Sequence, residues 1–111
     1  MTIEFQLEGQ KFVGLNGGPH FKFNESISFV VNCETQKDVD YFWEKLTANG
    51  GQESQCGWLK DKFGLSWQIV PTVAIEMLHD KDHEKSERVM NAVLQMKKID
   101  IKKLKAAYAG K

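Results

Sequence analysis

The segment from Trp58 to Pro71 constrains the fold of this chain more than any other part of it. Its middle, Lys62-Phe63-Gly64, has the charge and the glycine of a tight turn, and the residues after the turn alternate apolar with polar side chains. This alternation is typical of a strand with one apolar and one polar face, and a proline ends such a strand because it cannot donate to the ladder. The segment therefore predicts two strands whose polar face, which carries Gln68, is available to a ligand.

The first third of the chain predicts three further strands. Alternating apolar residues on both sides of Glu8-Gly9-Gln10 predict a β-hairpin over residues 2–15. The run Asn16-Gly17-Gly18-Pro19 interrupts regular structure and begins a loop. Aromatic and β-branched residues then predict a strand over Ile27–Cys33, with both faces at least partly buried.

The middle third predicts one helix between strands. Thr35 and Asp38 have the spacing of a capping box, which begins a helix, and Asn49-Gly50-Gly51 ends it. The apolar residues of this helix fall on one stripe: Val39, Phe42, Trp43 and Leu46. Residues 55–60 and 65–70 form the two strands of the opening segment. We expect Trp67 to pack in the core beneath the helix, and Lys60 to lie in a solvated turn.

The last third predicts a helical tail over residues 82–109. Asp82 and Asp100 each precede a stretch with helical spacing, where an aspartate is a favoured N-cap. The apolar positions of the first of these helices are Val89, Met90, Val93 and Leu94. The whole chain is expected to be a single domain over residues 1–111, with a hairpin at 2–15, a main module at 26–72 and this tail.

Composition excludes several classes of partner. The 111 residues include 15 basic and 15 acidic side chains, so the formal net charge is zero and nothing favours nucleic acid or an anionic membrane surface. No apolar run approaches the length of a spanning helix, and no leader-like segment opens the chain. We therefore expect a cytoplasmic protein. The two cysteines, Cys33 and Cys56, lack metal or redox spacing, so buried reduced thiols are the preferred interpretation.

Five stretches carry a resemblance to a known family, in the order Asn16–Phe23, Ile27–Cys33, Val39–Leu46, Gln55–Pro71 and Arg88–Tyr108. In them the chain resembles the PhnB-like family of the vicinal oxygen chelate superfamily, which also contains glyoxalase I and extradiol dioxygenases. Some members of this branch are called 3-demethylubiquinone-9 3-methyltransferases. The resemblance covers nearly the whole chain.

The resemblance implies an α+β fold built from a glyoxalase-like βαβββ module. Two such modules curl around a barrel-like cleft, with helices on the outer faces. This chain lacks the strand, helix and strand that precede the hairpin in typical members, so its first module is reduced to that hairpin. An uncovered sheet edge and apolar faces would remain. We therefore expect a homodimer that completes the cleft, with a truncated, marginally stable chain as the alternative.

The resemblance also points to candidate site residues. Gln68 lies where metal-using relatives often place a glutamate, and Ser26 or Ser28 lies near the position of a histidine. Gln is a poorer ligand than Glu, and Ser is rarely a zinc or iron ligand. We therefore expect Gln68 to form hydrogen bonds within a polar cleft rather than to complete a metal site.

His20, in the loop before the first of these strands, and Trp58, on the strand next to that of Gln68, complete the predicted cleft. His20 follows the glycine-rich run and is a weak candidate for proton transfer or, with Gln68, for binding a divalent metal. A loop histidine that bonds to the backbone is the preferred interpretation. Trp58 is a candidate wall of the cleft, whose predicted members are His20, Ser28, Trp58 and Gln68.

Two classes of function remain open. The preferred one is a PhnB-like protein that binds a small molecule in a cleft without a complete metal site. The alternative is a metal-dependent glyoxalase-like lyase or isomerase, or a dioxygenase. A methyltransferase of the usual type needs a glycine-rich turn between a strand and a helix, and Gly17-Gly18-Pro19 has no such setting. We therefore do not expect methyl transfer.

Overall fold

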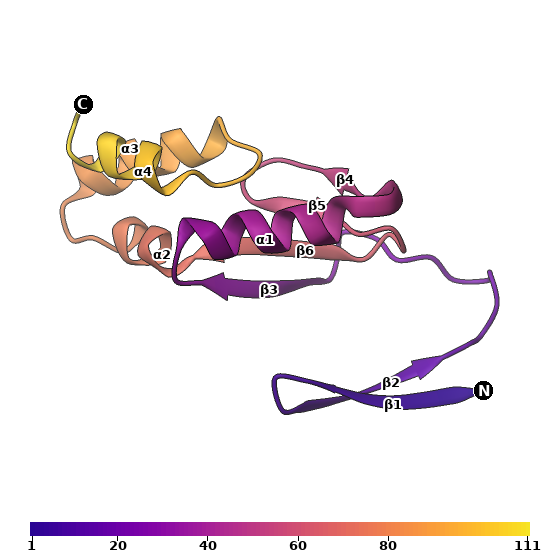
Figure 1. Ribbon diagram of the computed structural model, residues 1–111. Helices are drawn as coiled ribbons and strands as arrows, with labels where there is room; N and C mark the ends of the chain where they lie inside the picture. Colours follow the sequence, from indigo (N-terminus) through magenta and orange to yellow (C-terminus); the bar gives the residue numbers. More distant parts are fainter.

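The computed structural model describes residues 1–111, which fold into two β-sheets and two groups of helices (Figure 1). The strands are β1 (Thr2–Leu7), β2 (Gln10–Leu15), β3 (Ser28–Cys33), β4 (Gln52–Glu53), β5 (Trp58–Lys60) and β6 (Ser66–Pro71). The helices are α1 (Gln36–Thr47), a 3-10 turn η1 (Ala48–Gly50), α2 (Thr72–Leu78), α3 (His83–Leu94) and α4 (Ile101–Tyr108).

The main sheet has the strand order β3-β6-β5-β4. β3 and β6 are parallel, whereas β4, β5 and β6 pair antiparallel. The chain passes from β3 to the far strand β4 through α1, which covers one face of the sheet (Figure 1). A first core lies between α1 and this face: Cys33, Val39, Trp43, Leu59 and Ile69. The α+β class and the βαβββ order are thus as predicted, but the single chain forms no closed barrel.

A second core is formed by α2, α3 and α4 beyond the end of the sheet (Figure 1). Its buried members are Ala74, Met77, Val89, Val93, Ile99 and Leu104. The Arg88 guanidinium donates to the carbonyls of Ala107 and Tyr108 at 2.9 Å each, which satisfies carbonyl groups at the end of α4.

The predicted helix ends are confirmed. The Thr35 hydroxyl accepts a hydrogen bond from the Asp38 N–H at 3.1 Å, and α1 ends where Asn49 and Gly50 adopt φ angles of 58° and 108°. Asp82 and Asp100 accept bonds from the first turns of α3 and α4. Each of these signals is local, because the cap and the groups it satisfies lie within a few residues.

Four predictions about individual segments were wrong. The strand over residues 55–60 begins only at Trp58, because Cys56 and Gly57 adopt left-handed φ angles of 61° and 84° that no strand accommodates. Lys60 belongs to β5 rather than to a solvated turn. The strand β3 lies at the sheet edge, where Val30 is 51% exposed, so only one of its faces is buried.

The fourth error concerns the helical region, which begins at Thr72 rather than at residue 82. The helix α2 was not foreseen, and neither was the short strand β4. On α3 the stripe is only half buried, since Val89 and Val93 face the core while Met90 and Leu94 are exposed.

The predicted hairpin is confirmed as a separate two-stranded sheet, β1-β2, that lies beside β3 (Figure 1). Every residue in it is exposed except Phe12, which is half-buried. The Phe12 ring meets Phe29 of β3 edge-on, with ring centroids 5.7 Å apart, and stacks on Phe5 at 5.6 Å. No helix of the molecule combines the length and the apolar character needed to cross a membrane.

Candidate functional site

The face of the main sheet turned away from α1, here called the polar face, carries most of the predicted cleft residues. In the ladder Gln68 pairs with Val30 on one side and with Trp58 on the other, and directly paired residues project to the same side of a sheet. Ser28 and Ser66 form the next pair along β3 and β6, two residues away, and so share this face. The structure therefore brings Ser28, Trp58 and Gln68 together.

Ser28 and Gln68 are joined directly. The Gln68 side-chain N–H donates to the Ser28 hydroxyl at 2.9 Å, and both side chains are half-buried. This is the role that the sequence indicated for Gln68, a hydrogen bond within a polar surface. The Gln68 carbonyl oxygen forms no hydrogen bond within the chain and remains available as an acceptor.

His20 and Ser26 do not join this group. His20 is exposed in the loop between β2 and β3, and its imidazole forms no hydrogen bond with any residue, so the expected bond to the backbone is not found. Ser26 precedes β3, and its hydroxyl donates to Asn24. The first of the four predicted cleft residues therefore lies outside the cluster that the other three form.

These residues do not fit a metal site of the kind that metal-using relatives contain. No three His, Cys, Asp or Glu side chains lie close enough together to hold a metal ion. Ser28 and Gln68 offer a hydroxyl and an amide, which are already bonded to each other, and neither is a typical ligand of zinc or iron. No chemical step is therefore assigned to a metal at this face.

A cavity of about 180 Å³ adjoins the cluster at the edge of the polar face. Its lining residues are Glu25, Gln52, Glu53, Ser54, Trp58, Leu59, Lys60 and Ser66. Lys60 and Glu25 form an ion pair there, and the Lys60 ammonium lowers the pKa of the Glu25 carboxyl. With Glu53, the lining holds two carboxylates against one ammonium, so a small anion is disfavoured.

The hydroxyl of Ser66 is buried beside this cavity without a partner, and the fold alone does not explain this. The residue is 1% exposed, and its hydroxyl has no hydrogen-bond partner. No other buried side-chain nitrogen or oxygen in the chain is left unpaired. Burying an unpaired hydroxyl costs about 1–3 kcal/mol, and such groups require an explanation such as a ligand or a bound water.

The three tryptophans differ in what their indole N–H groups bind. Trp43 donates to Glu53 at 2.7 Å, and Trp67 donates to Asp61 at 2.9 Å. Trp58 makes no such bond, although it is half-buried. Trp67 also packs against the first core and against Phe29, with ring centroids 5.5 Å apart, as predicted. Only Trp58 therefore retains an unused donor, and it lines the cavity.

The sequence missed Ser66, Lys60 and Glu25 as members of this site. The strand period places Ser66 on the same polar face as Gln68, but nothing in the sequence distinguished it as a site residue. Glu25 gave no local signal, because its contact with Lys60 joins a loop to a strand that is 35 residues away in the sequence.

A wider groove of about 490 Å³ lies between the first turns of α1 and α4. Three backbone N–H groups there already have partners, since Thr35 accepts from Asp38, Gln36 from Ile101 and Asp100 from Lys103. The groove contains no unpaired buried side-chain nitrogen or oxygen, so the cavity beside Ser66 is the better candidate for a ligand site.

Comparisons with known proteins agree with the fold described above. The family described as 3-demethylubiquinone-9 3-methyltransferase matches residues 1–70. A solved structure of a PhnB protein from Bacillus cereus, which shares the family's description, superposes with a TM-score of 0.58 and 30% sequence identity. That match covers 64% of this chain and 64% of the Bacillus cereus chain. Comparison with curated proteins gives no match. The chain belongs to the PhnB-like, 3-demethylubiquinone-9 3-methyltransferase family.

Proposed function

We propose that this PhnB-like protein binds a small molecule on the polar face of its main sheet, without a complete metal site. The unpaired, buried hydroxyl of Ser66 carries this proposal. A ligand oxygen next to Ser66 would offset the cost of burying that hydroxyl. The free indole N–H of Trp58 supplies a further donor in the lining of the same cavity. The free carbonyl of Gln68, the ladder partner of Trp58, supplies an acceptor on the same face of the sheet.

The lining also indicates what kind of molecule fits. The lining contains two hydroxyls and one amide, the one ammonium is paired with a carboxylate, and a tryptophan provides a flat apolar surface. A planar, uncharged molecule with hydroxyl or carbonyl oxygens matches these groups. Catechol is therefore a suitable probe, because it combines a ring with two hydroxyl groups and no charge.

Titration with catechol, followed by ¹H–¹⁵N NMR, tests the proposal. The protein has three indole N–H signals, which replacement of single tryptophans by phenylalanine assigns. We expect the Trp58 signal and the Gln68 side-chain signals to shift together and to saturate, while the Trp67 signal, whose N–H donates to Asp61 outside the cavity lining, stays in place. Equal shifts of all three indoles, or no saturable shift at millimolar catechol, would contradict the proposal.

Ser66→Ala provides a second and more specific test. Removing an unpaired buried hydroxyl should raise the free energy of unfolding by about 1 kcal/mol, whereas it should weaken catechol binding several-fold. Ser26→Ala is the matched control, because its hydroxyl already donates to Asn24 away from the cavity. A Ser66→Ala protein that is less stable than the wild type would show that the hydroxyl has a partner in the folded chain.

The proposal does not extend to methyl transfer. Gly17-Gly18-Pro19 leads into a loop and then into β3, and no helix follows it. A glycine-rich turn that holds a methyl donor of the nucleotide type sits between a strand and a helix, so that setting is missing from this part of the fold.

A further inference from the structure

The buried position of Ser66 raises the question of how a ligand reaches it. Ser66 lines the cavity on the polar face, but the residue is 1% exposed and its hydroxyl oxygen is closed to solvent. In the ladder Ser66 lies between Ser28 of β3 and Lys60 of β5, and paired residues project to the same side of a sheet. A ligand can therefore contact this hydroxyl only after a group beside the cavity has moved.

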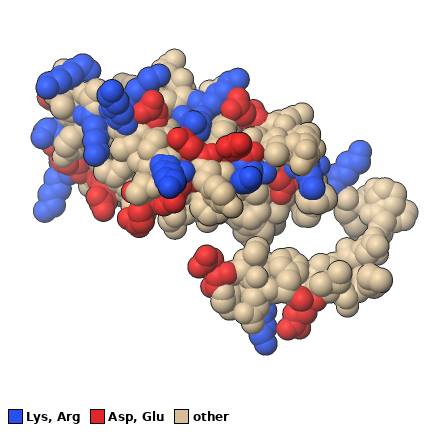
Figure 2. Space-filling model, in the orientation of Figure 1, with Lys and Arg blue, Asp and Glu red and all other residues tan.

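The segment with the fewest polar bonds to the rest of the molecule is the connecting loop, defined as residues 17–27 between β2 and β3. Its backbone groups form no hydrogen bond with any helix or strand. Its side chains bond locally, between Asn24 and Ser26, apart from one ion pair. The loop bends away from the end of β2 and returns to the start of β3 (Figure 1), and open space separates its outer part from the main sheet (Figure 2). Movement of this loop therefore breaks few polar bonds.

The one ion pair of the connecting loop joins Glu25 to Lys60 of β5. Both residues line the cavity, and Lys60 is the ladder partner of Ser66. The side chains of Glu25 and Lys60 are 60% and 36% exposed, so solvent screens their attraction. Exposed ion pairs contribute little to stability and weaken further at high salt. The contact that fastens the loop beside Ser66 is therefore easily broken.

We propose that the Glu25–Lys60 ion pair is a latch on the candidate cavity. When the pair forms, the connecting loop closes the cavity beside Ser66, and when the pair breaks, the loop moves outward and a ligand enters. Because the pair forms again once the ligand is inside, the latch changes the rates of entry and release by the same factor and leaves the dissociation constant unchanged. The role in ligand entry rests on the proposed function, whereas the opening of the loop does not.

Thiol labelling at position 66 tests the latch without a ligand. Ser66→Cys places a thiol of similar size in the closed position, where iodoacetamide reaches it only while the cavity is open. Adding Glu25→Gln to this protein should raise the labelling rate roughly two- to fivefold. Salt at about 1 M, which shortens the screening length to about 3 Å, should raise the rate with Glu25 present and change it little with Glu25→Gln. Mass spectrometry of peptides measures the rate, and the partly buried Cys56 gives a reference rate in every protein.

Glu53→Gln is the matched control for this labelling. It removes the other carboxylate of the lining, but Glu53 bonds to Trp43 and not to the connecting loop. The control therefore reports how much the loss of a nearby negative charge alone changes the reactivity of the thiol. A labelling rate that does not rise with Glu25→Gln, or that rises equally with Glu53→Gln, overturns the latch.

Catechol kinetics separate the latch from the proposed function. The exchange broadening of the Trp58 indole signal during a titration gives the rates of entry and release in the wild type and in the Glu25→Gln protein. We expect both rates to rise by the same factor in Glu25→Gln, with an unchanged dissociation constant. A changed dissociation constant with an unchanged rate of entry would show that Glu25 contacts the ligand and would overturn its role as a latch. If labelling responds as expected but catechol does not bind, the latch stands and the proposed function fails.

Discussion

Cys33 shows at the residue scale how position in the fold sets reactivity. The pKa of its thiol is raised to about 11, mainly by burial and to a smaller extent by the nearby Asp38 and Glu34 carboxylates. At pH 8 only about one Cys33 in a thousand is then a thiolate, the form that reacts with alkylating agents.

Iodoacetamide at pH 8 should therefore modify Cys56, which is only partly buried, and leave Cys33 unmodified until denaturant is added. The rate at Cys33 should rise as the pH approaches 11. Mass spectrometry of peptides from each site measures both rates, and Cys56 serves as the internal control. Modification of Cys33 in the native protein at the rate of a free thiol would show that it is not buried as described.

The positions of single residues could be predicted where a strand period fixes them, and not where they depend on loops or on packing. Ser28, Trp58 and Gln68 were placed together because the strand period and the resemblance both fix which side of a strand a residue faces. His20 could not be placed, since it lies in a loop whose path no periodic pattern determines. Ser66 was missed because its unpaired hydroxyl is a property of the packed structure and leaves no trace in the sequence.

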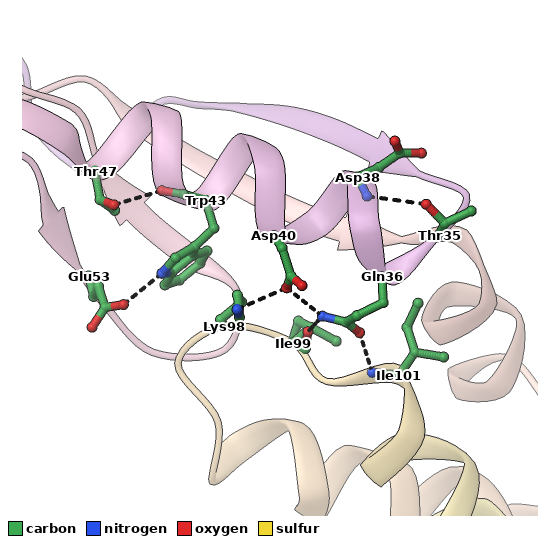
Figure 3. A network of polar contacts seen from close by, with 10 residues as sticks. All are labelled: Thr35, Gln36, Asp38, Asp40, Trp43, Thr47, Glu53, Lys98, Ile99 and Ile101. Carbon is green, nitrogen blue, oxygen red and sulfur yellow. Dashed lines mark hydrogen bonds and ion pairs between the residues drawn. The ribbon is translucent and has the colours of Figure 1, made fainter.

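At the scale of helices and strands, Gln36 connects α1 to the segment at the start of α4 (Figure 3). Its side-chain N–H group donates to the Ile99 carbonyl at 3.0 Å and to Asp40 at 2.9 Å. Its side-chain oxygen accepts from the Ile101 N–H at 2.8 Å. Asp40 also forms an ion pair with Lys98 at 2.8 Å, and Lys98 and then Gln36 lower the pKa of that carboxyl. One side chain thus joins the two cores.

Gln36→Leu should destabilise the protein by about 1–3 kcal/mol, because it leaves a partly buried carbonyl and an N–H group without partners. Urea unfolding measures the change. Lys37→Ala on the same helix turn, where the side chain is exposed, should change the free energy of unfolding by less than about 0.5 kcal/mol. Equal stability of the Gln36→Leu protein and the wild type would show that the bridge contributes nothing.

Elements whose signals are local were predicted well, and those that depend on tertiary contacts were not. The caps at Thr35, Asp82 and Asp100 were each recognised from a few neighbouring residues. The left-handed pair at Cys56 and Gly57 was not, because it is set by bonds to the Met96 and Lys97 carbonyls at 2.8 Å, far along the chain. Tertiary contacts of this kind override the local preference for strand.

At the scale of the whole molecule, the expected homodimer that would cover the exposed hairpin gives a prediction about thermal stability. If folding and association are coupled, the midpoint of thermal unfolding rises with protein concentration. For a dimer of this size we expect an increase of about 3 °C for each tenfold increase in concentration. Scanning calorimetry at several concentrations measures this. Ile3 and Val13 are exposed apolar residues of the hairpin, and a variant with both replaced by lysine should show a constant midpoint. A constant midpoint for the wild type would contradict the coupling.

The exposed hairpin β1-β2 also has a consequence for synthesis of the chain. Translation proceeds from the N-terminus, so this hairpin leaves the ribosome before any part of the main sheet exists. Its strands carry alternating apolar residues with few charges (Figure 2), and unpaired segments of this kind aggregate when they are exposed during folding. The supply of chaperones during expression should therefore decide how much of this protein survives to fold.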